Sequence, residues 1–175
     1  MKIFLKIVTI TILLLQTQAK AKEFVYILND NCINNLYNEA EKHFSNSNIT
    51  AIRDPRGIIL RLFFKNPQSE THDISNQIYK EIKIIEYFLA KIENPAIIEV
   101  HTGKTSNKNI KSWEISTVIA NNIESIITKP VGLISQERIN SIGYGEFLPA
   151  KNTPNNGGKE DCRIDIIILC NISGE

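Results

Sequence analysis

The sequence predicts an α/β fold, a two-layer α+β sandwich in which helices pack on one face of a mixed four-stranded sheet. Short runs of β-branched and apolar residues alternate with longer segments whose apolar residues recur every three or four positions. Asn, Pro and Gly separate these segments. The chain has 175 residues, which suffices for one domain with a single core. The expected order of core elements is βαβαββ.

Residues 1–21 have the pattern of a secretory signal peptide. Lys2 and Lys6 precede an apolar run over residues 7–15, and Ala19-Lys20-Ala21 provides a small-residue cleavage site. An uncleaved membrane anchor is the alternative, but the run is shorter than the roughly 20 residues that span a bilayer. We therefore expect export to the periplasm or cell envelope, with membrane association only through an uncleaved N-terminal segment.

Residues 22–56 are expected to form an N-terminal extension with one helix. From Cys32 to Phe44 the apolar residues fall on one helical face. The following stretch, NSNITAIRDPRG, is rich in residues that break helices and strands and indicates a loop.

The core begins with a strand at Gly57–Phe64, because GIILRLFF is short and apolar and a turn signal follows it. A helix comes next, with Asp73 as its expected N-cap and Asn94-Pro95 as its stop. The later elements are a strand at Ala96–His101, a polar loop at 103–112, a helix at Trp113–Ile127, a strand at Arg138–Tyr144, a loop at Gly145–Glu160 and a strand at Ile164–Leu169.

The chain has three cysteines, and an exported protein can form disulfides. Cys162 and Cys170 lie on one expected strand, roughly 26 Å apart when extended, so they cannot pair with each other. Any disulfide joins Cys32 to one of them; the alternative is that all three are reduced and half buried. No CxxC or HxxxH pairing supports a metal site, and we expect no metal and no cofactor.

The charge distribution argues against a nucleic-acid partner. Lys and Arg total 20 against 19 Asp and Glu, the net charge is +1, and no basic block stands out.

Four segments, in order, resemble the OmpA-like peptidoglycan-associated domain that also occurs in the flagellar stator protein MotB. They are IEVHTG (98–103), WEISTVIAN (113–121), RINSIGYGEFLP (138–149) and NTPNNGGKEDCRIDIII (152–168). The resemblance covers about residues 57 to 170 and implies an OmpA-like domain over residues 57–175. It also implies non-covalent binding of the peptide stem of peptidoglycan, in which an aspartate and a helix arginine hold a zwitterionic diaminopimelate end.

The residues that the family uses for this clamp are only partly present. His101 and Thr102 match the family strand end, but the acid position is Gly103 and the helix arginine position is Ile119. Ser112 replaces the family asparagine, and Cys162 replaces the first of two arginines, which leaves Arg163. Loss of both charges together can be nearly neutral for folding, whereas loss of one leaves the other uncompensated. We expect Ile119 to be a core residue and His101 to be structural.

Two functions therefore stay open. In the first, a non-enzymatic envelope protein binds peptidoglycan weakly through Thr102, backbone amides near Gly103, Ser116 and Arg163, with little dependence on salt. In the second, the degenerate fold is a structural scaffold that engages envelope proteins. A stator role is disfavoured because the 7–15 run has no ionisable residue for ion conduction. An enzyme would need a pocket that joins His101, Glu146 and a cysteine, and no motif indicates one.

Overall fold

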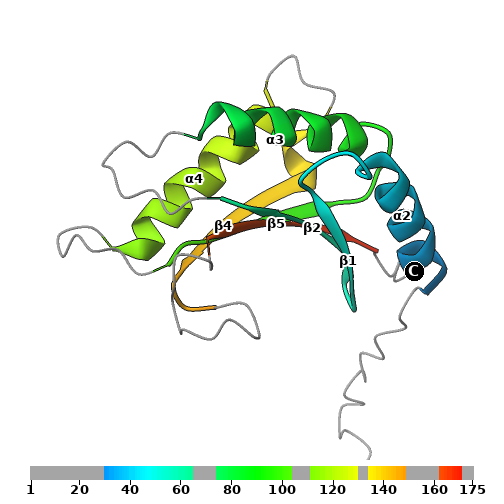
Figure 1. The fold of residues 1–175 in the computed structure, drawn as a ribbon, viewed down its shortest axis with the longest axis horizontal. Coiled ribbons are helices and arrows are strands. Elements are labelled where there is room, and N and C mark those ends of the chain that lie inside the picture. Colours follow the sequence, from blue (N-terminus) through cyan, green and yellow to red (C-terminus); the bar gives the residue numbers. More distant parts are fainter. Residues whose placement is uncertain (1–29, 65–73, 104–110, 130–133, 149–161, 171–175) are drawn as a thin grey trace, which may run out of the picture.

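The computed structural model describes residues 30–64, 74–103, 111–129, 134–148 and 162–170, so the expected signal peptide lies outside the described residues. Within these described residues, three α-helices and five strands follow one another, with a short 3-10 turn at Gln136–Arg138 (Figure 1). The helices are α2 (Asp30–His43), α3 (Asn76–Leu89) and α4 (Ser112–Ile127). The strands are β1 (Thr50–Asp54), β2 (Gly57–Phe63), β3 (Ala96–His101), β4 (Ile139–Gly145) and β5 (Arg163–Leu169).

The sheet has five strands in the order β1-β2-β5-β3-β4, in which β3 and β4 run parallel and the other neighbours run antiparallel. The expected sandwich and its mixed sheet are confirmed, but the prediction of four strands was wrong. The additional strand is β1, which lies in the stretch expected to be a loop. It forms a hairpin with β2 through Pro55 and Arg56. None of its residues is fully buried, and a strand with no buried face does not need the alternation of apolar and polar residues by which a strand is recognised in sequence.

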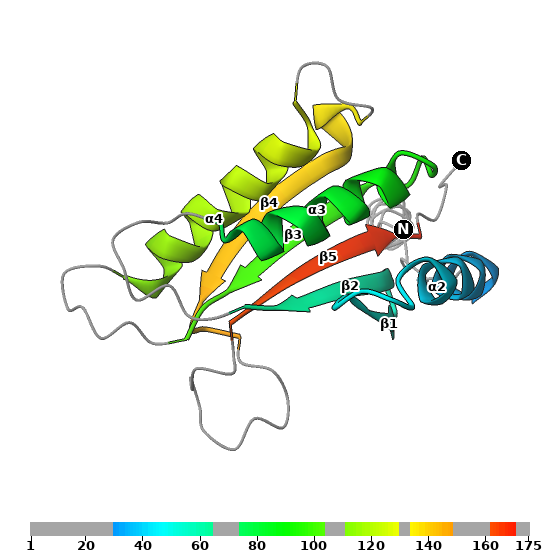
Figure 2. The same cartoon turned by 45° about the horizontal axis from the view of Figure 1, so that its top comes forward.

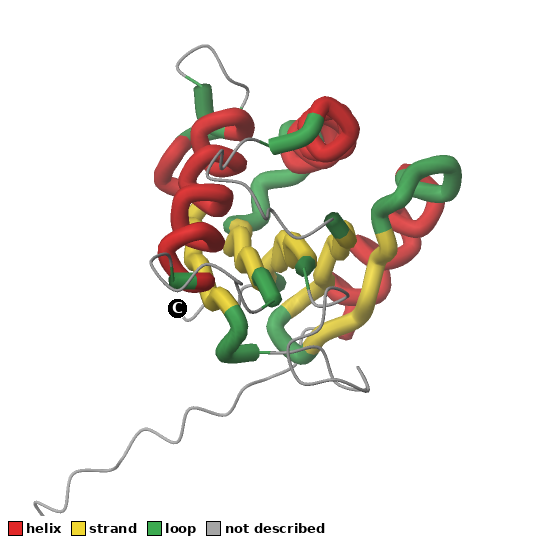
Figure 3. The backbone as a smooth tube through the Cα atoms, turned by 60° about the vertical axis from the view of Figure 1, so that its left-hand side comes forward, coloured by secondary structure: helices red, strands yellow, loops and turns green. Residues whose placement is uncertain are grey.

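The helices lie on one side of the sheet, as expected, and the main core fills the space between them (Figures 2 and 3). α4 packs along β4, and α3 begins after Ser75, whose Oγ accepts a hydrogen bond from Ile78 N at 3.3 Å. Ser75, rather than the expected Asp73, is therefore the N-cap. Side chains of α2 belong to the same core as those of α3, α4 and the central strands.

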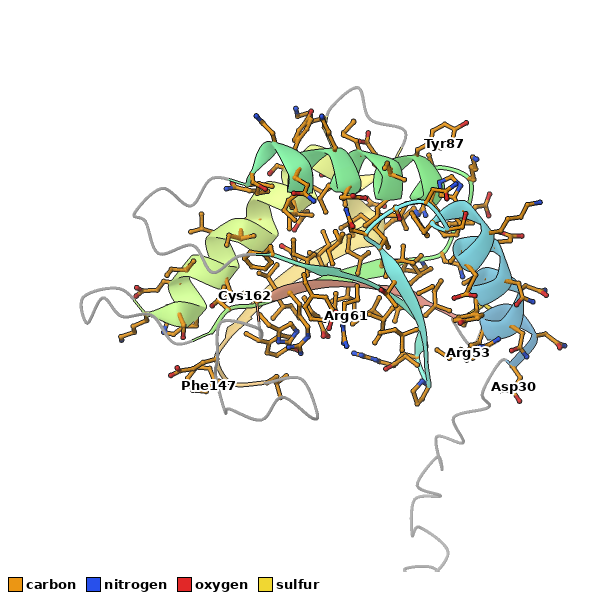
Figure 4. The ribbon with its side chains drawn as sticks, in the orientation of Figure 1. Asp30, Arg53, Arg61, Tyr87, Phe147 and Cys162 are labelled. Carbon is orange, nitrogen blue, oxygen red and sulfur yellow. A yellow bond between two sulfur atoms is a disulfide. The ribbon has the colours of Figure 1, made fainter. Side chains whose placement is uncertain are left out.

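The opposite face of the sheet carries charged side chains. Residues paired across neighbouring strands lie on the same face, and the register pairs Asp165 of β5 with Arg61 of β2 and Glu99 of β3. Arg61 donates to both oxygens of Asp165, at 2.7 and 2.8 Å. Figure 4 shows Arg61 on the side of the sheet away from α3 and α4.

A disulfide fixes α2 to the end of β5. It joins Cys32 to Cys170, which are 138 residues apart in sequence, and Cys162 is not part of it. This settles the alternatives in favour of an oxidised Cys32. The hairpin and the disulfide attach the N-terminal extension to the sheet at two separate places.

His43 at the end of α2 is expected to make stability depend on pH. The centroid of its ring lies 4.9 Å from that of Phe44 and 5.3 Å from that of Phe88. Burial is the main cause that lowers the pKa of His43, and the positive charge of Lys91 lowers it further. The unfolded chain therefore binds the proton more readily, so stability falls as pH drops below about 6.5. We expect the urea midpoint of His43→Gln to fall less between pH 7.5 and 5.5 than that of the native protein. An equal fall in both proteins would contradict the prediction.

Candidate functional site

The positions suggested by the resemblance meet where β3 ends and α4 begins, and we call this region the β3–α4 junction (His101–Gly103, Ser112–Ser116 and Gly145). Thr102 is central to it. Its Oγ1 donates to Ser112 O at 3.0 Å, and its backbone N–H donates to Gly145 O at 3.0 Å. Thr102 is 1% exposed, so its hydroxyl connects β3 to α4 and does not face solvent.

Ser116 connects α4 to β4 in the same way. Its Oγ donates to Trp113 O at 3.0 Å and accepts from Gly145 N at 2.8 Å. Ser116 is fully buried, and Ser112 is also buried. Three of the expected ligand contacts, Thr102, Ser112 and Ser116, are therefore buried structural residues of the junction.

The start of α4 is capped by a side chain of its own first turn. Lys111 N donates to Glu114 Oε2 at 3.1 Å, which satisfies one of the backbone donors at the helix start. The carboxylate of Glu114 thus stabilises the helix end.

α4 approaches β4 so closely that only glycine fits at two strand positions. A Cβ on Gly143 would lie 2.2 Å from Thr117 N, and one on Gly145 would lie 2.6 Å from Trp113 N. Gly145 also has φ of +55°, a backbone conformation that favours glycine. The GYG segment therefore sets the distance between helix and strand.

Gly143→Ala is expected to lower the free energy of unfolding by about 1–3 kcal/mol, because the added methyl group must push α4 off the strand. Urea denaturation would measure the loss. Asn140→Ala, at an exposed position of the same strand, is the matched control and should stay within about 0.5 kcal/mol of the native protein. A stable Gly143→Ala variant would mean that the helix can shift at little cost.

The two positions at which the OmpA-like family carries charged residues are both buried in this protein. Ile119 is 5% exposed and packs in the core, as the sequence predicts. The backbone N–H of Gly103 donates to Cys162 Sγ at 3.2 Å. Cys162 is itself buried at the start of β5, so this contact links the ends of β3 and β5.

Arg163 is the one arginine of the family's terminal pair that is present in this chain, and it lies at this end of the sheet. Its Nε donates to Asp165 Oδ2 at 3.0 Å and its Nη2 donates to Leu148 O at 3.0 Å. Nη1 is buried and has no hydrogen-bond partner among the residues that the structure describes. Arg163 is paired with His101 across β5 and β3, so it lies beside the β3–α4 junction.

Large apolar side chains border the junction, and the sequence did not indicate their exposure. Trp113 is 44% exposed, and Phe147 and Leu148 are 70% and 49% exposed. All three lie in the segments that resemble the OmpA-like domain, and from sequence alone an apolar residue in such a segment could equally be buried in the core. Figure 4 shows Phe147 extending away from the sheet.

Sequence reasoning also missed the charged face. Arg61 and Asp165 lie on strands whose other residues are mostly apolar, and they are 104 residues apart. Their contact depends on strand order, which no single segment encodes.

Of the lysines in the 103–112 stretch, Lys104 and Lys108 lie outside the described residues.

Among the residues that the structure describes, no helix is long and apolar enough to cross a bilayer.

No protein-family model and no curated protein sequence matches the chain. Solved structures do match it. A MotB-like protein from Desulfovibrio vulgaris is 19% identical with a TM-score of 0.63, covering 83% of this chain and 96% of that one.

Two further structures are similar over most of the chain. The cell wall anchor of the T6SS from Pseudomonas aeruginosa is 12% identical with a TM-score of 0.55, covering 78% of this chain and 96% of that one. The OmpA-like domain of FopA1 from Francisella tularensis is 12% identical with a TM-score of 0.51, covering 69% and 80% of the two chains. Together with the order of strands and helices, these likenesses show that the chain has the fold of the OmpA-like domain.

Proposed function

We propose that the protein is a non-enzymatic component of the bacterial cell envelope, located in the periplasm, that binds peptidoglycan weakly and non-covalently. The hydroxyls of Thr102 and Ser116 make hydrogen bonds that hold the fold together, so neither is available as a nucleophile or base. Similarity in fold to a cell wall anchor and to a MotB-like protein supports an envelope role.

The observation that carries the proposal is the guanidinium of Arg163. Its Nη1 has no partner among the described residues, and an arginine fork suits a carboxylate such as those of a peptide stem. Binding is weak because Gly103 and Ile119 supply neither the acid nor the second cation. One retained charge also gives a small dependence on salt.

Co-sedimentation with purified sacculi tests this proposal. We expect the exported chain, residues 22–175, to pellet with sacculi at high sacculus concentration, and to pellet nearly as well at high salt. Arg163→Gln should stay in the supernatant. Arg53→Gln is the matched control, because Arg53 lies on β1 and stacks on Tyr37, away from the junction. Circular dichroism confirms that each variant is folded. Equal pelleting of the native protein and Arg163→Gln would refute a role for Arg163, and no pelleting would refute binding.

The exposed apolar residues at the junction favour a second function, that of a scaffold for another envelope protein. Exposed apolar side chains can mark protein contacts, and Trp113, Phe147 and Leu148 are exposed in the segments that meet at or follow the junction. If this is the function, light scattering should show a larger complex with an envelope extract fraction, and Phe147→Ser should abolish it without affecting sedimentation with sacculi. Loss of both properties in Phe147→Ser would instead place a single site at the junction.

A further inference from the structure

Three side chains on the charged face of the sheet place possible metal ligands together. Glu99 and His101 are two residues apart on β3 and share a face, and the register brings Asp165 of β5 beside Glu99. One ligand atom from each residue lies within 4.8 Å of the other two. From this geometry we propose that Glu99, His101 and Asp165 bind one divalent transition-metal ion of the Zn²⁺ type.

The state of His101 points to a ligand in this cluster. The ring is 2% exposed and is stacked on Tyr144 with centroids 5.2 Å apart. Neither ring nitrogen has a hydrogen-bond partner among the described residues. A buried polar group without a partner is costly, so native proteins rarely leave one without an ion, a water or another group beside it.

The distances around His101 fit a bridging ion better than a direct bond. Nε2 lies 3.8 Å from Glu99 Oε2 and 3.9 Å from Asp165 Oδ2, too far for hydrogen bonds. Zn²⁺ binds nitrogen and oxygen ligands at about 2.0–2.2 Å, so a small inward shift of these side chains brings all three atoms within ligand range.

Arginines form ion pairs with both carboxylates of the cluster. Arg56 Nη1 donates to Glu99 Oε1 at 3.2 Å, which leaves Oε2 facing His101. Arg61 donates to both oxygens of Asp165, and Arg163 donates to Oδ2. Asp165 must exchange the bond from Arg163 to ligate an ion, so Glu99 and His101 are the principal ligands. Contacts of this kind orient the ligands of a metal site.

The same arginines determine which cations are accepted. Asp54, Glu99 and Asp165 are balanced by Arg56, Arg61 and Arg163, since each carboxylate is paired with a guanidinium. Ca²⁺ and Mg²⁺ are held by oxygen ligands and charge, and gain little in a balanced cluster. An ion with affinity for imidazole, such as Zn²⁺ or Co²⁺, gains from His101 itself.

Calorimetric titration of the disulfide-intact protein with ZnCl₂ tests the proposal. The chain has three histidines, so the double variant His43→Gln, His72→Gln keeps His101 as its sole imidazole and controls for adventitious binding. We expect this control to bind one equivalent of Zn²⁺ as the native protein does. Glu99→Gln should bind at least about tenfold more weakly. MgCl₂ and CaCl₂ should give no binding at the same concentrations.

A second measurement avoids any variant of the site itself. In the same double control variant, Zn²⁺ should shift the NMR signals of the one imidazole, and Co²⁺ should give a visible spectrum without a thiolate charge-transfer band. Unmoved imidazole signals, equal affinity in Glu99→Gln, or equal binding of Mg²⁺ and Ca²⁺ would each overturn the proposal. A thiolate band would assign the ion to Cys162.

Discussion

Replacing both Cys32 and Cys170 with serine is expected to lower the free energy of unfolding by about 4–5 kcal/mol. The disulfide closes a loop between residues that are 138 positions apart. A cross-link over a loop of roughly 100 residues lowers the entropy of the unfolded chain enough to stabilise the folded state by nearly this amount. Urea denaturation of the native and double-serine proteins would measure the loss. Reductant provides the control, because it should lower the urea midpoint of the native protein and leave that of the variant unchanged.

A loss below about 1 kcal/mol would contradict this expectation. It would mean that Leu36, Ala40 and the other core residues of α2 keep the unfolded chain compact, or hold the extension in place, without the cross-link. Measuring the denaturant slope together with the midpoint separates these cases, since a compact unfolded state lowers the slope.

Ile119→Arg, which introduces the arginine that the resembled family has at this position, is expected to lower the free energy of unfolding by at least about 3 kcal/mol. Ile119 is 5% exposed within the core, and the substitution buries a charge without a partner. The neighbouring Val118 is 40% exposed on the same helix, so Val118→Arg is the matched control and should change stability by less than about 0.5 kcal/mol. Thermal and urea unfolding of the two variants would give the difference directly.

If Ile119→Arg proved as stable as Val118→Arg, the guanidinium would have to reach solvent through a rotation or shift of α4. The clamp of the family would then be recoverable by two substitutions, at Gly103 and Ile119. We expect instead that the helix packs around isoleucine, because the bond from Gly145 N to Ser116 Oγ and the close approach at Gly143 fix its position on β4.

The sequence predicted the helices and central strands well because their apolar periodicity is strong. α4 was expected at Trp113–Ile127 and spans Ser112–Ile127. β1 was missed because an edge strand has only one neighbour, and TAIRD shows neither alternation nor a buried run. The absence of the charged clamp could be read from single positions, and so could the burial of Ile119.

Contacts that depend on strand order could not be read in this way. The cluster of Glu99, His101 and Asp165 exists because β5 inserts between β2 and β3, and sequence spacing gives no sign of it. The internal hydrogen bonds of Thr102 and Ser116 were likewise invisible, since a family motif shows which residue types occur but not whether they face a ligand or the protein.

The central place of β5 has a consequence for the timing of folding. Among the described residues β5 is the last strand in sequence, yet it separates β2 from β3, so the two halves of the sheet have no direct strand pairing until it arrives. The strands that precede β5 cannot complete the sheet while the chain is still emerging from the ribosome, and the cross-link to Cys170 also waits for this strand. Most of the stabilising pairings are long-range, which slows folding. The topology therefore delays the native state until β5 has been synthesised.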